Sequence, residues 1–78
     1  MVKINVMYFG VLSEITGKSN EIRECSCTIR DLIIELTKEY PEMSKHNFAV
    51  SLNQTISRDN PALQDNDQIA LLPPFAGG

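Results

Sequence analysis

The sequence predicts an α+β fold in which one mixed β-sheet packs on one main helix, followed by a flexible C-terminal tail. Three observations lead to this class. Residues 2–9 alternate with the period of a strand, residues 28–40 place apolar side chains at helical spacing, and short apolar runs separated by turn residues follow. A chain of 78 residues is the length of one small domain, so we expect a single domain over residues 1–78.

The first strand is expected over Val2–Phe9, and Gly10 ends it. Met7 and Phe9 are out of phase with the apolar positions and should lie on the opposite sheet face. The positions expected to face the core are Val2, Ile4, Val6 and Tyr8.

A short turn or single helical turn is expected over Val11–Ile15, and Gly17 closes it. Residues 21–26 then predict a second strand, antiparallel to the first, although their alternation is poor.

Thr28 is expected to begin the main helix, because Thr28 and Asp31 have the spacing of a capping box. Pro41 should end the helix, since the residue before a proline is pushed out of the α region. One face of this helix is apolar and should pack on the sheet. It consists of Ile29, Leu32, Ile33, Leu36 and Tyr40.

Three further strands are expected: Phe48–Leu52, a short return strand over residues 55–57 after an Asn53-Gln54 turn, and Gln68–Leu72. Between them, Leu63 should be a core residue, and Asn66 should adopt a positive φ in a tight turn. In the last strand Ile69 and Leu71 should face the core, whereas Ala70 and Leu72 should face outward. This element order fits a β-grasp, or ubiquitin-like, architecture.

Composition excludes several classes of function. The net charge of −3 without a basic stripe argues against a nucleic-acid partner. The first apolar stretch contains Lys3 and Asn5, so it is not expected to be a signal peptide, and no apolar run is long enough for a membrane helix. We therefore expect a cytoplasmic protein with no membrane partner.

Few residues offer chemistry of their own. Cys25 and Cys27 are best explained as two reduced structural thiols, because a zinc site needs four ligands and His46 is the only other soft candidate. Asp65 and Asp67 fit turn formation better than a metal loop, so no metal site is expected. The sequence contains no evident nucleophile–base pair, which leaves open whether the chain is catalytic at all and fits a non-catalytic carrier.

The end of the chain, residues 73–78, is Pro-Pro-Phe-Ala-Gly-Gly. Pro73 and Pro74 should stop the last strand and stiffen its exit. Gly77 and Gly78 have no side chains, so they can enter a narrow cleft. Fully extended, six residues reach roughly 20 Å at about 3.3–3.6 Å each. We interpret these residues as an arm that delivers its own carboxylate to another protein's active site.

These segments together resemble the family of small, sulfur-carrier subunits of molybdopterin synthase, which are ubiquitin-like sulfur carriers. The most specific match is residues 67–78, which combine a turn, a strand, Pro-Pro, two free positions and Gly-Gly. Two positions depart from the family pattern. Asn66 stands where the family usually has Gly, and Phe75 stands where a smaller residue such as Val is commoner.

The resemblance implies a carrier cycle. The Gly78 carboxylate would be adenylated with ATP by a ubiquitin-activating-like adenylyltransferase and converted to a thiocarboxylate by a persulfide sulfur donor. The tail, with Pro73, Pro74, Phe75, Ala76 and Gly77 leading to Gly78, would then enter the synthase large subunit. There it would give sulfur to cyclic pyranopterin monophosphate and form the molybdopterin dithiolene. The family also suggests a heterotetramer, with no cofactor bound permanently by the carrier.

A docking surface is expected beside the tail. Met7, Phe9 and Leu72 should lie near one another on the sheet face opposite the helix, and exposed apolar patches on small domains usually mark interfaces.

Three alternatives remain open. The chain could be a sulfur carrier for thiamine or cysteine biosynthesis, a ubiquitin-like modifier joined to target proteins through Gly78, or a binding module with an inert tail. Against the other sulfur carriers, the Pro73-Pro74 pair and the outward apolar patch favour the molybdopterin interpretation.

Overall fold

A computed structural model of the protein describes residues 2–25, 28–56 and 59–73, with the side chain of Cys25 excepted. The predictions that concern residues 26, 27, 57 and 74–78 lie outside the described residues. The elements occur in the order β1 (Val2–Tyr8), α1 (Val11–Thr16), β2 (Asn20–Cys25), α2 (Ile29–Glu39), the 3₁₀-helix η1 (Pro41–Lys45), β3 (Ala49–Leu52), β4 (Thr55–Ile56) and β5 (Gln68–Leu72).

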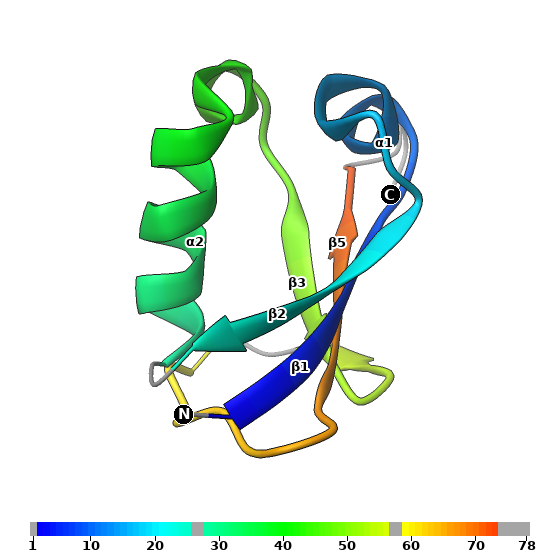
Figure 1. The fold of residues 1–78 in the computed structure, drawn as a ribbon. Coiled ribbons are helices and arrows are strands. Elements are labelled where there is room, and N and C mark those ends of the chain that lie inside the picture. Colours follow the sequence, from blue (N-terminus) through cyan, green and yellow to red (C-terminus); the bar gives the residue numbers. More distant parts are fainter. Residues whose placement is uncertain (1, 26–27, 57–58, 74–78) are drawn as a thin grey trace.

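The five described strands form one mixed sheet in the order β2-β1-β5-β3-β4. β1 pairs antiparallel with β2 and parallel with β5, while β3 pairs antiparallel with β5 and β4. α2 packs across one face of this sheet, and α1 lies at the end where β5 stops (Figure 1). The predicted α+β class, a mixed sheet packed on one main helix, is confirmed.

The core lies between α2 and the sheet. Ile4, Val6 and Tyr8 are buried as predicted, and Val2 is partly buried. Ile69 and Leu71 of β5 are fully buried beside them, and the predicted core role of Leu63 is confirmed. From α2 the buried residues are Ile29, Leu32 and Leu36, with Ile33 and Tyr40 partly buried around them.

The start of α2 is fixed by the capping box that the sequence predicts. Thr28 Oγ1 accepts from the Asp31 backbone amide at 3.3 Å, and the Asp31 carboxylate accepts from the Thr28 amide at 3.3 Å. Asn60 accepts from the next amide, that of Arg30, at 2.8 Å. These bonds satisfy amides that have no partner inside the helix, so the first turn of α2 is stabilised from both sides.

The segment after α2 was not predicted. Pro41 ends the α-helix as expected, but the chain continues in η1, which places Met43 fully inside the core. A single apolar residue in a short polar stretch carries no periodicity, so the sequence pattern could not identify Met43 as a core residue.

The turns follow the predicted chemistry. Asn66 has a φ of 69°, which confirms its left-handed conformation. Asn53 and Gln54 join β3 to β4 with φ values of 50° and 74°, the geometry that suits a two-residue hairpin. Phe48 lies just outside β3, which begins one residue later than predicted, although its side chain still packs on the core.

Candidate functional site

The tail leaves the sheet at a fixed point between β5 and the loop before α1. Pro73 follows β5 directly, and a Cβ built on Gly10 would lie 2.8 Å from Pro73 Cγ. Next to this contact, the Phe9 amide at the end of β1 donates to the Leu71 carbonyl of β5 at 3.3 Å. Because Gly10 has no side chain and a φ of 59°, the proline ring can lie against its backbone. We call Gly10 and Pro73 the tail anchor.

The remaining predicted tail residues, Pro74, Phe75, Ala76, Gly77 and Gly78, lie outside the described residues. Their predicted role as a delivery arm stays a prediction. The structure locates Pro73, the residue that precedes them.

The structure brings the three predicted docking residues to one region of the sheet face opposite α2. Met7 lies opposite Ala70 on β5, and Leu72 lies opposite Ala49 on β3. Phe9 follows β1 next to the end of β5 and is 44% exposed, whereas Met7 and Leu72 are half-buried. We call Met7, Phe9 and Leu72 the outer patch. Its use as an interface is not tested by the fold.

Ala70 departs in part from its prediction. It lies on the outer face as expected, but it is only 9% exposed. Its register partners on the same face are Met7 of β1 and Ser51 of β3. A short side chain at the centre of a sheet is buried by its neighbours even on the open face.

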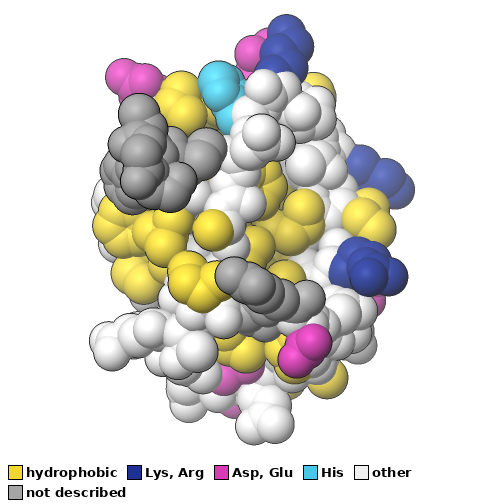
Figure 2. All heavy atoms as spheres, turned by 180° about the vertical axis from the view of Figure 1, so that it is seen from behind, with side chains coloured by type: hydrophobic (Ala, Val, Ile, Leu, Met, Phe, Trp, Pro, Cys, Tyr) yellow, Lys and Arg dark blue, Asp and Glu magenta, His cyan; other side chains and the backbone are white. Residues whose placement is uncertain are grey.

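The outer face extends further than the sequence indicated. Ile56 of β4 lies opposite Ser51 and is 51% exposed, which continues the apolar surface across the sheet from Met7. Seen from behind, hydrophobic side chains gather across the middle of the molecule, and most charged side chains lie toward its margin (Figure 2). The two-residue length of β4 gave too short a pattern for Ile56 to be assigned to this face.

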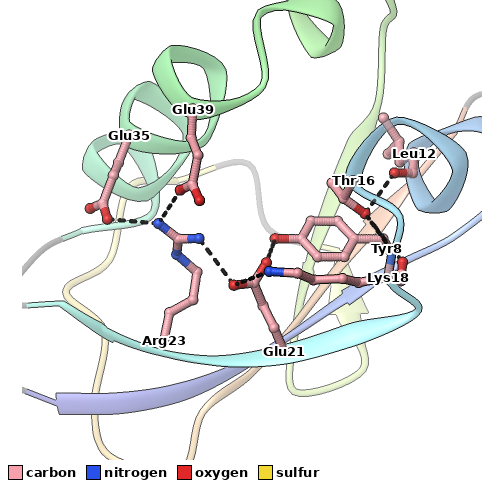
Figure 3. Close-up of polar contacts among 8 residues, drawn as sticks. All are labelled: Tyr8, Leu12, Thr16, Lys18, Glu21, Arg23, Glu35 and Glu39. Atoms are coloured by element: carbon pink, nitrogen blue, oxygen red, sulfur yellow. Dashed lines mark hydrogen bonds and ion pairs between the residues drawn. The ribbon is translucent and has the colours of Figure 1, made fainter.

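A polar network on the α2 side of the sheet was missed entirely (Figure 3). The Tyr8 hydroxyl donates to Glu21 Oε2 at 2.7 Å, and Arg23 Nη1 donates to Glu21 Oε1 at 3.1 Å. Arg23 Nη2 donates to Glu35 at 2.8 Å and to Glu39 at 2.7 Å. One guanidinium thus joins β2 to two turns of α2. The signal available was the i, i+2 spacing of Glu21 and Arg23, which puts both side chains on the face that meets α2.

Burial and these contacts shift the pKa values of Tyr8, Glu21 and Arg23. Burial raises the pKa of Tyr8 far above its usual value, and the hydrogen bond to Glu21 raises it further. Burial alone would raise the pKa of Glu21, but the Tyr8 hydrogen bond and the Arg23 charge outweigh it and hold that pKa below its ordinary value. Burial opposes the charge of Arg23, yet its bonds to Glu39 and Glu35 keep the pKa above the usual range. The network is therefore a fixed ionic link at neutral pH.

The other polar candidates have structural partners. The Asp67 carboxylate accepts from the Gln64 amide at 2.8 Å and from the Asn53 side chain at 3.0 Å, and Asp65 accepts from the Lys3 amide at 2.8 Å. Both aspartates thus fasten the turn before β5. His46 is exposed at the end of η1.

Among residues 2–25, 28–56 and 59–73 no group of three or more metal-ligating side chains occurs. No helix in that part of the chain is long and apolar enough to cross a membrane.

Several known proteins are similar to this chain. It is 31% identical to the molybdopterin synthase sulfur carrier subunit of Mycobacterium tuberculosis, with both chains covered completely. A Helicobacter pylori structure described as a complex of subunits 1 and 2 of molybdopterin-converting factor contains a chain with a TM-score of 0.74 and 26% identity. That match covers 99% of this chain and 100% of the other.

Two further solved structures share the fold at lower identity. A Pyrococcus furiosus protein assigned as subunit 1 of molybdopterin converting factor has a TM-score of 0.88 at 23% identity, over 96% of this chain and 100% of the other. Small archaeal modifier protein 1 of Methanosarcina acetivorans has a TM-score of 0.82 at 23% identity, over 100% and 98%. Together they identify the sheet and helix as a ubiquitin-like β-grasp fold. The ThiS family matches residues 6–78, which is nearly the whole sequence. The chain therefore belongs to the ThiS family.

Proposed function

We propose that this chain is the sulfur-carrier subunit of a molybdopterin synthase and that it carries sulfur as a thiocarboxylate on Gly78. The observation that supports this most strongly is the full-length likeness to a relative of that name, at 31% identity. The fold adds a second support, because the tail anchor and the outer patch lie at the same end of the sheet. A partner that binds the outer patch would receive the tail that starts beside it.

The chemistry follows from the weakness of a carboxylate as an electrophile. The Gly78 carboxylate attacks the α-phosphate of ATP and releases pyrophosphate, which gives an acyl-adenylate with AMP as a good leaving group. The terminal sulfur of a persulfide attacks the acyl carbon and expels AMP. The product is an acyl disulfide that keeps the donor's original sulfur–sulfur bond. A thiol then attacks the donor's own sulfur in that bond and forms a disulfide with the donor, and the terminal sulfur stays on Gly78 as a thiocarboxylate.

The division of labour follows from what the described residues offer. The polar residues described above, apart from the exposed His46, are bonded in turns, caps and the Tyr8–Glu21–Arg23 network, where they stabilise the fold. In the proposal the activating enzyme supplies the adenylation chemistry, and the synthase large subunit supplies the pterin pocket and acid–base groups. The carrier supplies the reacting sulfur and a surface that positions it. The pterin acceptor is cyclic pyranopterin monophosphate, to which two sulfurs are added.

The test is intact mass spectrometry of the full chain after incubation with ATP, a ubiquitin-activating-like adenylyltransferase and a persulfide donor. We expect a mass increase equal to the replacement of one oxygen by sulfur. A variant that lacks Gly78 should keep its circular dichroism spectrum and show no increase. The thiocarboxylated chain, mixed with large subunit and cyclic pyranopterin monophosphate, should yield molybdopterin and return to its original mass.

Other outcomes would refute the proposal. Conjugates of higher mass with target proteins would indicate a protein modifier. Thiocarboxylation without transfer to the pterin would indicate a carrier for thiamine or cysteine biosynthesis. Full activity of the variant without Gly78 would indicate a binding module.

A further inference from the structure

β2 is an edge strand of the described sheet. Among the described residues it pairs only with β1. The Tyr8 amide donates to the Ser19 carbonyl at 2.9 Å, while the Asn5 amide donates to Asp67 on the other side of β1 at 2.9 Å. In an antiparallel ladder bonded pairs alternate, so these two bonds set which residues of β2 face away. The backbone groups of Asn20, Ile22 and Glu24 point away from the sheet.

This edge also has an apolar centre. Ile22 lies in the middle of β2 and is 73% exposed, more than any other large apolar residue described. Edge strands are usually protected by charged side chains, above all lysine, by proline or by a bulge. β2 contains no lysine or proline, and its register with β1 runs without a break over six pairs, although Glu21, Arg23 and Glu24 are charged. An edge without a lysine, proline or bulge and with an exposed isoleucine at its centre can accept another strand.

We propose that β2 pairs antiparallel with β2 of a second copy of this chain, with Ile22 opposite Ile22. Two β2 strands can form hydrogen bonds only if residues whose backbone groups point away from the sheet lie opposite each other. The register with Ile22 opposite Ile22 meets this condition. On the outer face the two Ile22 side chains meet, and each Asn20 lies opposite Glu24, so an amide donor faces a carboxylate. On the α2 face each Glu21 lies opposite Arg23.

The neighbouring registers are unfavourable for reasons of charge. The nearest other registers still let the outward backbone groups of the two β2 strands face each other. One of them sets Glu21 opposite Glu21, and the other sets Arg23 opposite Arg23. Like charges directly opposite each other destabilise a strand pair. Glu21 and Arg23 are already paired within each chain, and the register centred on Ile22 is the one that sets no like charges opposite each other. Because this register is self-complementary, we assign a second copy of the chain as the partner.

Such a dimer leaves the proposed carrier site free. β1 separates β2 from β5, so the tail anchor lies one strand away from the new contact. Two five-stranded sheets would join into one, with both α2 helices on the same face. A single strand pair buries less than the roughly 1,200 Å² of a standard stable interface, so the dimer should be weak and depend on concentration. This inference does not depend on the proposed function.

The test is sedimentation equilibrium of the full chain over a range of concentrations. We expect a reversible monomer–dimer equilibrium. Ile22→Lys should shift it at least tenfold toward monomer, because it places two lysines opposite each other at the centre. Ile34→Lys is the matched control, since Ile34 is an exposed isoleucine on α2 at 48% exposure and should leave the equilibrium unchanged. Circular dichroism checks that both variants fold.

Cross-linking tests the register. In a background with Cys25→Ser and Cys27→Ser, Ile22→Cys should form a disulfide-linked dimer under mild oxidation, because bonded antiparallel pairs have Cα atoms about 5.5 Å apart, which suits a disulfide. Asn20→Cys should not, since it lies opposite Glu24. A monomer at all concentrations, an unchanged equilibrium for Ile22→Lys, or efficient cross-linking at Asn20 instead of Ile22 would each overturn the proposal.

Discussion

Gly10 and Pro73 lie in direct contact where the last strand leaves the sheet, and the space between them does not admit a side chain on residue 10. An added Cβ would come within 2.8 Å of Pro73 Cγ. The residue after the first strand thus packs against the first residue of the tail, and only a glycine at position 10 leaves room for the proline ring.

Gly10→Ala should therefore destabilise the fold more than Gly17→Ala. Both glycines have positive φ, but a Cβ on Gly17 would meet nothing within 4 Å. Gly17 lies in the left-handed region, with a φ of 72° and a ψ of 17°, where an alanine costs about 1–2 kcal/mol. Gly10 has a ψ of −135°, outside that region and suited to glycine, and the clash with Pro73 adds to its conformational cost. Urea unfolding of both variants measures the difference. A double variant of Gly10→Ala with Pro73→Ala should be more stable than the sum of its single changes implies, and strict additivity would show that the contact is unimportant.

Tyr8→Phe should lower the free energy of unfolding at pH 7 by about 1 kcal/mol, because Glu21 loses a hydrogen-bond donor. The pKa of Tyr8 is raised in the folded state, so its contribution is complete below the unfolded value of about 10 and is lost as pH rises above it. The difference between the two proteins should shrink above about pH 10. A difference that stays constant through this range would mean that the hydroxyl does not titrate differently on unfolding.

Glu21→Gln should make the protein less sensitive to acid. The folded pKa of Glu21 is lowered, so its stabilising effect is present above the unfolded value of about 4.3 and is lost as pH falls through the folded value. Wild type should lose stability in that range more steeply than the variant. Glu24→Gln is the control, because Glu24 lies on the opposite face of β2 and is exposed. Equal slopes for Glu21→Gln and wild type would contradict the network.

Phe9→Asp or Leu72→Asp should weaken binding to the synthase large subunit at least tenfold while the fold is kept, because a charge would be placed in the outer patch. Ile34→Asp matches Phe9→Asp in exposure, 48% against 44%, but lies on α2. It should bind as wild type does in isothermal titration calorimetry. If the Phe9 and Leu72 variants bind with an unchanged dissociation constant, the outer patch is not the docking surface.

The sequence was sufficient for the parts of the fold that depend on a repeating pattern or on a local cap. The alternation in β1, the apolar face of α2 and the Thr28–Asp31 pair each need only neighbouring residues, and all three are confirmed. Met43 and the Arg23 bonds to Glu35 and Glu39 depend on segments far apart in the chain. No local pattern marks such contacts in advance.

In the candidate site, too, some residues could be placed from a local pattern and others could not. The phase of Met7 and Leu72 against the core residues placed them on the outer face, since alternation in a strand is local. The contact between Gly10 and Pro73 could not be predicted, because it requires the parallel pairing of the first and last strands. That pairing is a property of the assembled sheet.

The central place of β5 also links folding of the sheet to the synthesis of residues 68–72. These residues lie between β1 and β3, and without them the β1–β2 and β3–β4 pairs are not joined. A chain still on the ribosome and lacking these residues cannot assemble the sheet, because among the described strands its two halves meet only through β5. Since Leu72 belongs to that strand, unfinished chains also lack the complete outer patch. They should not compete with finished carriers for the same partner.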